Sequence, residues 1–118
     1  MAYPDDPMPD ISAAEAIALV EAGTFLLDVR EQHEWDAGHA PGAHWLPRST
    51  LKERLDEVPR DRTVLVTCLV GGRSFRVTDL LLREGFDAVN LVGGMEAWHA
   101  AGGPLVSDGP EAPRLEAP

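Results

Sequence analysis

The fold is decided by the stretch Thr63-Val64-Leu65-Val66-Thr67-Cys68-Leu69-Val70-Gly71-Gly72-Arg73-Ser74-Phe75-Arg76. Its first five residues are β-prone, which predicts a buried strand. The strand runs into Cys68, the single cysteine of the chain, and a helical pattern begins after two glycines and an arginine. A helix that starts there points backbone N–H groups and the positive end of its dipole back at the loop. We therefore expect Cys68 to lie among amides, partly or wholly as the thiolate, which is the reactive form.

Further short apolar runs alternate with helical patterns along the rest of the chain. Residues 24–29 and 86–91 form two such runs without polar alternation, as in strands that are covered on both faces. A capping box of Ser12 and Glu15 opens the first helical pattern. This alternation predicts an α/β domain with a parallel sheet, whose ligands bind outside the carboxyl ends of the strands. Asp28 and Cys68 both fall at such ends.

Length and composition limit the classes of protein that the chain can represent. Its 118 residues suit one domain, and its one cysteine excludes an intrachain disulfide. That cysteine usage favours a reducing compartment, and the acidic N-terminus lacks the pattern of a signal peptide, so we expect a cytoplasmic protein. No apolar run approaches the ~20 residues of a membrane span.

The charge of the chain argues against nucleic acid as a partner. Ten lysines and arginines stand against twenty acidic residues, which gives a net charge of −10, and phosphate binding requires a basic surface. The sequence has one local exception, because no acidic residue lies between Asp61 and Asp79, where Arg73 and Arg76 are found. This stretch can attract an anion. Arg76 can equally belong to a solvated helix face.

The loop and two other segments resemble the rhodanese family of sulfurtransferases. Cys68 to Ser74 is similar to the family's active-site loop, Cys-x-x-Gly-x-Arg-Ser. The upstream and downstream signatures of the family resemble Asp28-Val29-Arg30, Glu34-Trp35, Gly38-His39, Pro41-Gly42-Ala43, Pro47 and Gly93-Gly94-Met95 with Trp98. The chain departs from them with Ala40, where isoleucine is usual, and with Trp45, where a small polar residue is common.

The resemblance implies a fold and a division of the chain. It implies a rhodanese-like three-layer α/β/α domain with a mainly parallel five-stranded sheet and helices on both faces, covering residues 10–106. Residues 1–9 are expected to form a flexible N-terminal lead. Residues 107–118 hold three prolines and one large apolar residue, Leu115, so we expect a disordered C-terminal tail.

The resemblance also implies a mechanism. Cys68 would take the sulfane sulfur of a small anionic donor such as thiosulfate as a persulfide and pass it to a thiol, cyanide or a protein. The active-site loop would be formed by Leu69, Val70, Gly71, Gly72, Arg73 and Ser74, with Arg73 either binding the donor or holding the loop. No cofactor or metal is required. The sequence does not indicate the oligomeric state.

Other interpretations of these residues remain open. Asp28 and Arg30 can support the nucleophile, although tying a strand end to nearby loops is the commoner role of such a pair. His39 and His44 lie five residues apart without a third ligand, which does not favour zinc. Cys68 alone could be a small core residue.

Three other functions are compatible with a cysteine in such a loop. A persulfide carrier that takes sulfur from a protein or glutathione persulfide would use the same thiol. A phosphatase or arsenate reductase would also use a cysteine, amides and an arginine. Rhodanese-fold phosphatases typically have one more residue between the cysteine and the arginine of the loop. Here four residues separate Cys68 from Arg73, and this count favours sulfur over a tetrahedral phosphate as the group that binds. A non-catalytic binding module usually lacks the cysteine.

Overall fold

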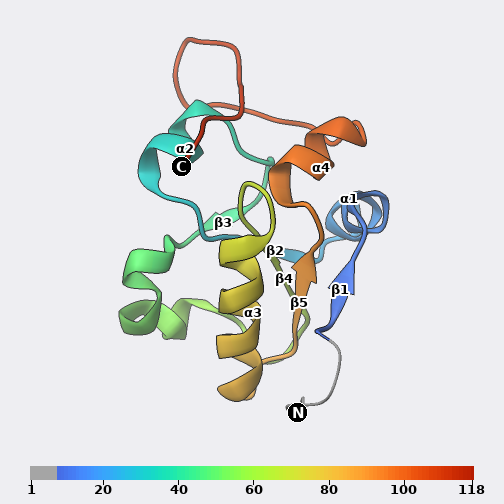
Figure 1. Cartoon of the computed structure of the whole chain (residues 1–118), viewed down its shortest axis with the longest axis vertical. Coiled ribbons are helices and arrows are strands. Elements are labelled where there is room, and N and C mark those ends of the chain that lie inside the picture. Colours follow the sequence, from blue (N-terminus) through green and yellow to red (C-terminus); the bar gives the residue numbers. More distant parts are fainter. Residues whose placement is uncertain (1–7) are drawn as a thin grey trace.

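A computed structural model describes residues 8–118, and it contains one five-stranded sheet (Figure 1). Neighbouring strands are parallel throughout, in the order β1-β5-β4-β2-β3. The strands are β1 (Asp10–Ile11), β2 (Phe25–Asp28), β3 (His44–Trp45), β4 (Val64–Thr67) and β5 (Ala88–Leu91). The α-helices are α1 (Ala13–Glu21), α2 (Gln32–Ala37), α3 (Gly72–Arg83) and α4 (Gly94–Ala100), and η1 (Arg48–Glu57) is a 3₁₀ segment. The α/β fold with a parallel five-stranded sheet is confirmed.

The sheet separates two buried clusters, as the adjacent strands β2 and β4 show. Leu27 on β2 and Val66 on β4 are register partners and belong to one buried cluster. Their neighbours Leu26 and Leu65 are also partners and belong to the other cluster. Side chains alternate between the faces of a strand, so apolar residues at successive positions require a cover on both sides.

Helices supply that cover on both faces of the sheet. The cluster around Leu27 includes Leu51 of η1 and Val77 of α3, whereas the other includes Ala16 of α1 and Trp98 of α4. Figure 1 shows α3 and α1 on opposite sides of the strands. Of the expected capping box at α1, the N-cap bond is present, since the Ser12 hydroxyl accepts from the Glu15 N–H at 3.2 Å. The Glu15 carboxylate accepts from the Ser12 hydroxyl at 3.1 Å. Within residues 8–118 no helix is long and apolar enough to cross a membrane.

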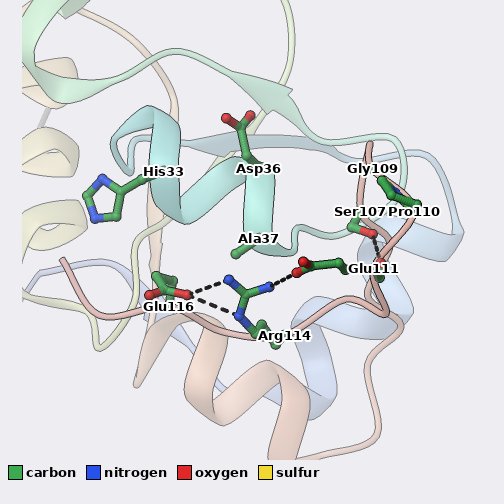
Figure 2. A pocket seen from close by; sticks show the side chains of 9 residues that line it. All are labelled: His33, Asp36, Ala37, Ser107, Gly109, Pro110, Glu111, Arg114 and Glu116. Atoms are coloured by element: carbon green, nitrogen blue, oxygen red, sulfur yellow. Dashed lines mark hydrogen bonds and ion pairs between the residues drawn. The ribbon is translucent and has the colours of Figure 1, made fainter.

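The C-terminal segment differs from the expected disordered tail. Residues 107–118 fold back beside α2 (Figures 1 and 2), and the Arg114 N–H donates to the Ala37 carbonyl at 2.9 Å. Leu115 packs against the cluster that contains Trp98. A side chain at Gly38 would collide with the Arg114 backbone, so glycine permits this close approach. Main-chain hydrogen bonds and one leucine hold the segment in place. This attachment requires no apolar periodicity, so the sequence pattern did not predict it.

The beginning of the chain lies partly outside the description. Residues 1–7 of the expected flexible lead are outside the described residues. The Pro9 carbonyl accepts from the Asn90 N–H at 2.9 Å, so Pro9 already borders β5. The ordered domain therefore begins before residue 10.

Packing of the C-terminal segment predicts a stability effect for Leu115→Ala. The side chain is half-buried, so its truncation should lower the free energy of unfolding by roughly 1–2 kcal/mol, less than a fully buried leucine would cost. The matched control is Leu19→Ala on α1, because Leu19 is 40% exposed and should change stability by less than about 0.5 kcal/mol. Urea denaturation of the full chain measures both. Equal, small effects would show that the segment does not stabilise the domain.

Candidate active site

Cys68 follows β4 directly and is fully buried at the amino end of α3. Its Sγ accepts hydrogen bonds from the Gly71 N–H at 3.1 Å and from the Ser74 N–H at 3.3 Å. Gly71 caps α3 in the left-handed region, with φ of 102°, which glycine adopts without a steric penalty. The loop therefore turns two amides and the positive end of a 12-residue helix toward one sulfur atom.

The start of α4 holds the other side of this loop. The Met95 N–H donates to the Cys68 carbonyl at 2.8 Å, and the Glu96 N–H donates to the Leu69 carbonyl at 3.0 Å. Both carbonyls thus turn toward α4, while the Gly71 and Ser74 amides turn toward Sγ. This packing requires Gly94, because an added Cβ would lie 2.5 Å from the Cys68 oxygen and 2.6 Å from the Leu69 oxygen. The glycine pair before Met95 belongs to the site for this reason.

Arg73 is bound by a carboxylate that the sequence-based site did not include. Its two terminal nitrogens donate to the two Glu34 oxygens, each at 2.7 Å. The Glu34 side chain is fully buried and that of Arg73 is 21% exposed. Such a two-point pair fixes both side chains in one geometry. Arg73 thus connects the first turn of α3 to α2.

The environment of this pair shifts the pKa values of both groups. Burial alone would raise the pKa of Glu34, but hydrogen bonds from Arg73 and from the Glu31 backbone outweigh burial and lower it. The hydrogen bond to Glu34 raises the pKa of Arg73. Both side chains are therefore charged at neutral pH, and the positive charge of Arg73 is already matched.

Asp28 and Arg30 form a second buried ion pair, at the carboxyl end of β2. The Arg30 Nη2 lies 2.8 Å from the Asp28 Oδ2, and both side chains are fully buried. Arg30 also donates to the Gly38 carbonyl at 2.8 Å and to the Glu34 carbonyl at 3.4 Å. These contacts match the interpretation that the pair ties the end of β2 to neighbouring loops. They also hold the backbone of the residue that binds Arg73.

The two histidines of the upstream segment belong to separate networks. The His39 ring stacks on Trp35 at 3.6 Å and its Nδ1 lies 2.8 Å from the Trp35 carbonyl. The His44 Nε2 lies 3.0 Å from a Glu57 oxygen. Trp45, the unusual residue of this segment, donates to the Arg30 carbonyl at 2.8 Å. Within residues 8–118 no group of three potential ligands is arranged to hold a metal ion.

A hollow of about 420 Å³ lies between α2 and the C-terminal segment, away from the loop (Figure 2). Two of its carboxylates, Glu111 and Glu116, are bound by Arg114 at 3.0 Å. The hollow contains none of the residues around Cys68. The two ion pairs of Arg114 join residues within the C-terminal segment.

Known proteins similar to this chain share its sequence and its fold. The rhodanese-like domain family matches residues 12–101. A sulfurtransferase of Allochromatium vinosum is 37% identical over 84 residues, which cover 70% of this chain and 78% of that protein. The probable adenylyltransferase/sulfurtransferase MoeZ of Mycobacterium tuberculosis is 42% identical over 76 residues, which cover 62% of this chain and only 19% of MoeZ. A rhodanese-related protein from Thermoplasma volcanium has a crystal structure that superposes with a TM-score of 0.78 at 32% identity, covering 83% of this chain and 97% of that one.

The Glu34–Arg73 pair predicts that Glu34→Gln destabilises the protein. Loss of the carboxylate leaves the Arg73 charge unmatched in a mostly buried place, so the free energy of unfolding at pH 7 should fall by roughly 3 kcal/mol. The matched control is Asp79→Asn, which breaks the exposed Arg83–Asp79 pair and should cost less than about 1 kcal/mol. Equal effects of the two substitutions in denaturant titrations would contradict a structural role of the buried pair.

The lowered pKa of Glu34 also fixes how this difference depends on pH. The stabilisation by Glu34 should be complete above its ordinary pKa of 4.5 and should disappear as the pH falls through the lowered value in the folded protein. Wild type and Glu34→Gln should therefore become more similar in stability below pH 4.5. A difference that stays constant down to the acid-unfolding pH would argue against the pair.

Proposed function

Because the chain belongs to the rhodanese-like domain family, we propose that it is a sulfurtransferase that carries sulfane sulfur as a persulfide on Cys68. A donor such as thiosulfate supplies the sulfur, and a thiol, cyanide or a protein accepts it. The observation that carries the proposal is the placement of the Cys68 Sγ against two amides at the head of α3. We place this reaction in a reducing compartment such as the cytoplasm, where a lone thiol stays available.

The first half-reaction needs only the thiolate and the donor. The Cys68 thiolate forms a bond to the outer sulfur of thiosulfate, the sulfur–sulfur bond of thiosulfate breaks, and its electron pair leaves with sulfite. The terminal sulfur of the new persulfide then carries the negative charge. In this proposal the loop amides, two of which contact Sγ, stabilise that charge as an oxyanion hole stabilises oxygen. In the second half-reaction a thiophilic acceptor attacks that terminal sulfur and releases the Cys68 thiolate.

Ser74 offers a further donor for the persulfide. Its hydroxyl is buried and has no hydrogen-bond partner among residues 8–118, whereas its N–H already bonds to Sγ. An unsatisfied buried hydroxyl is costly and calls for an explanation. A second sulfur atom on Cys68 would add an acceptor beside this residue, which fits a loop built for the persulfide state.

Arg73 serves in this proposal as a positioning residue. Glu34 binds both of its terminal nitrogens, which matches the charge of Arg73 and fixes the loop. The matched charge of Arg73 weakens its attraction for a phosphoryl dianion, which disfavours the phosphatase alternative. A persulfide relay between proteins remains the second candidate, because it uses the same thiol and the same amides.

Incubation with excess thiosulfate and no acceptor should add the mass of one sulfur atom to the protein, on Cys68. The persulfide accumulates because only an acceptor removes it. Cys68→Ser should fold and gain no sulfur, since a neutral hydroxyl does not store it. Intact-mass spectrometry measures the adduct, and cyanide should remove it. An adduct on the serine variant, or none on wild type with any donor, would disprove the proposed nucleophile.

Gly94→Ala should slow this sulfur loading much more than its effect on stability suggests. The added methyl group must displace the Cys68 and Leu69 carbonyls, and misplacement by about 1 Å costs on the order of a hundredfold in rate. The matched control is Gly102→Ala, because Gly102 also has a positive φ but no atom near an added Cβ. It should lose roughly 1–2 kcal/mol of stability and keep its loading rate. Similar loading by both variants would show that α4 does not position the loop.

A further inference from the structure

A second hollow, of about 190 Å³, lies between η1 and α3. Three cationic side chains line it, Arg48 and Lys52 from η1 and Arg76 from α3, together with a single carboxylate, Glu53. Figure 1 shows η1 (green) beside α3 (yellow). Apolar side chains, including Leu51 and Val77, complete its wall. The hollow thus combines an apolar wall with an excess of positive charge.

The charge of this hollow is opposite to that of the protein. The chain carries −10 overall, yet three of its ten cationic residues meet here. Within residues 8–118, five of the ten form an ion pair. The other five do not, and three of these, Arg48, Lys52 and Arg76, line this hollow. Unmatched cations gathered in a hollow raise the local concentration of anions. An anionic ligand would match them.

The hollow lies on the same side of the sheet as the thiol. Leu51 and Val77, from its wall, belong to the buried cluster that includes Cys68. Arg73, Arg76 and Leu80 follow one another at helical spacing, so they share one face of α3. Glu34 forms an ion pair with Arg73 at the amino end of this face. Arg76, one turn further, is the first cation on this face that has no carboxylate partner within residues 8–118.

The size of the hollow and its distance from sulfur restrict the ligand. The Ser74 N–H contacts Sγ. Along the axis of α3, Arg76 lies about 3 Å and Leu80 about 9 Å beyond Ser74, because they follow it by two and six residues. An elongated donor has a second end to place here while its sulfur lies at Sγ, whereas thiosulfate has none. The hollow is smaller than the about 300–1,000 Å³ of a site that encloses a whole ligand. It suits the end of an elongated molecule.

We propose that this hollow binds the carboxylate end of a low-molecular-weight, peptide-like persulfide whose outer sulfur is presented to Cys68. The inference rests on the proposed function and specifies a donor class for it. In the transfer, the Cys68 thiolate bonds to the outer sulfur, and the sulfur–sulfur bond of the donor breaks. The electron pair leaves with the inner sulfur as a thiolate, the proton of the persulfide stays on the transferred sulfur, and no oxidant or reductant is needed.

The test compares glutathione persulfide, which has two carboxylates, with the persulfide of glutathione diethyl ester, which has none. The kcat/KM of the full chain for sulfur loading should be at least about tenfold higher with the acid than with the ester. This ratio corresponds to the free energy of one charge-assisted hydrogen bond. Lys52→Gln and Arg76→Gln should each lose most of this preference through a higher KM for the acid. High salt should weaken the preference as well.

Arg62→Gln is the matched control, because Arg62 is exposed, forms no ion pair within residues 8–118 and precedes β4 at its opposite end from Cys68. It should keep the wild-type preference. Equal use of acid and ester by wild type, or equal loss in all three variants, would overturn the assignment of the hollow while thiosulfate still loads Cys68. Failure of thiosulfate and both persulfides to load Cys68 would overturn the proposed function as well.

Discussion

The position of the loop around Cys68 depends on the two-point ion pair between Arg73 and Glu34. Arg73 lies in the first turn of α3, so the carboxylate that holds it also fixes where the amino end of that helix points. Glu34 is fixed in turn, because Arg30 binds its carbonyl and Asp28 binds Arg30. The loop amides are therefore aimed at sulfur by a chain of contacts that begins at the end of β2.

The four charges of this chain of contacts are tolerable because they are matched. Asp28 and Glu34 supply two negative charges, and Arg30 and Arg73 supply two positive ones. Each carboxylate meets a guanidinium with good geometry, which is the condition under which buried charges cost little. Removal of one member leaves its partner without compensation. The C-terminal segment adds a further constraint, since its hydrogen bond to Ala37 holds the end of the helix that carries Glu34.

The sequence predicts the parts of this structure that repeat a local pattern. The buried runs that became β2, β4 and β5, the N-cap at Ser12 and the loop after Cys68 all have signals within a few residues. The strands β1 and β3 contain two residues each, which is too short for any periodicity. The C-terminal segment is attached to α2 through backbone groups, which any sequence supplies. No apolar pattern was therefore available to predict this attachment. The Glu34–Arg73 contact joins residues 39 apart, so spacing alone could not pair them, although Glu34 stood inside a recognised motif.

The engagement of Arg73 changes how the charge of the loop should be understood. An arginine next to the thiol suggests an anion-binding residue, but Glu34 matches its charge, and the two hydrogen bonds to Sγ come from backbone amides. Amides suit the single negative charge of a persulfide sulfur, whereas a phosphoryl group with several charged oxygens would need an additional cation. In the proposed function, further cations near the site would therefore strengthen the attraction of a charged donor. In the proposed binding of a long donor, those cations are Arg48, Lys52 and Arg76, which line one hollow between η1 and α3.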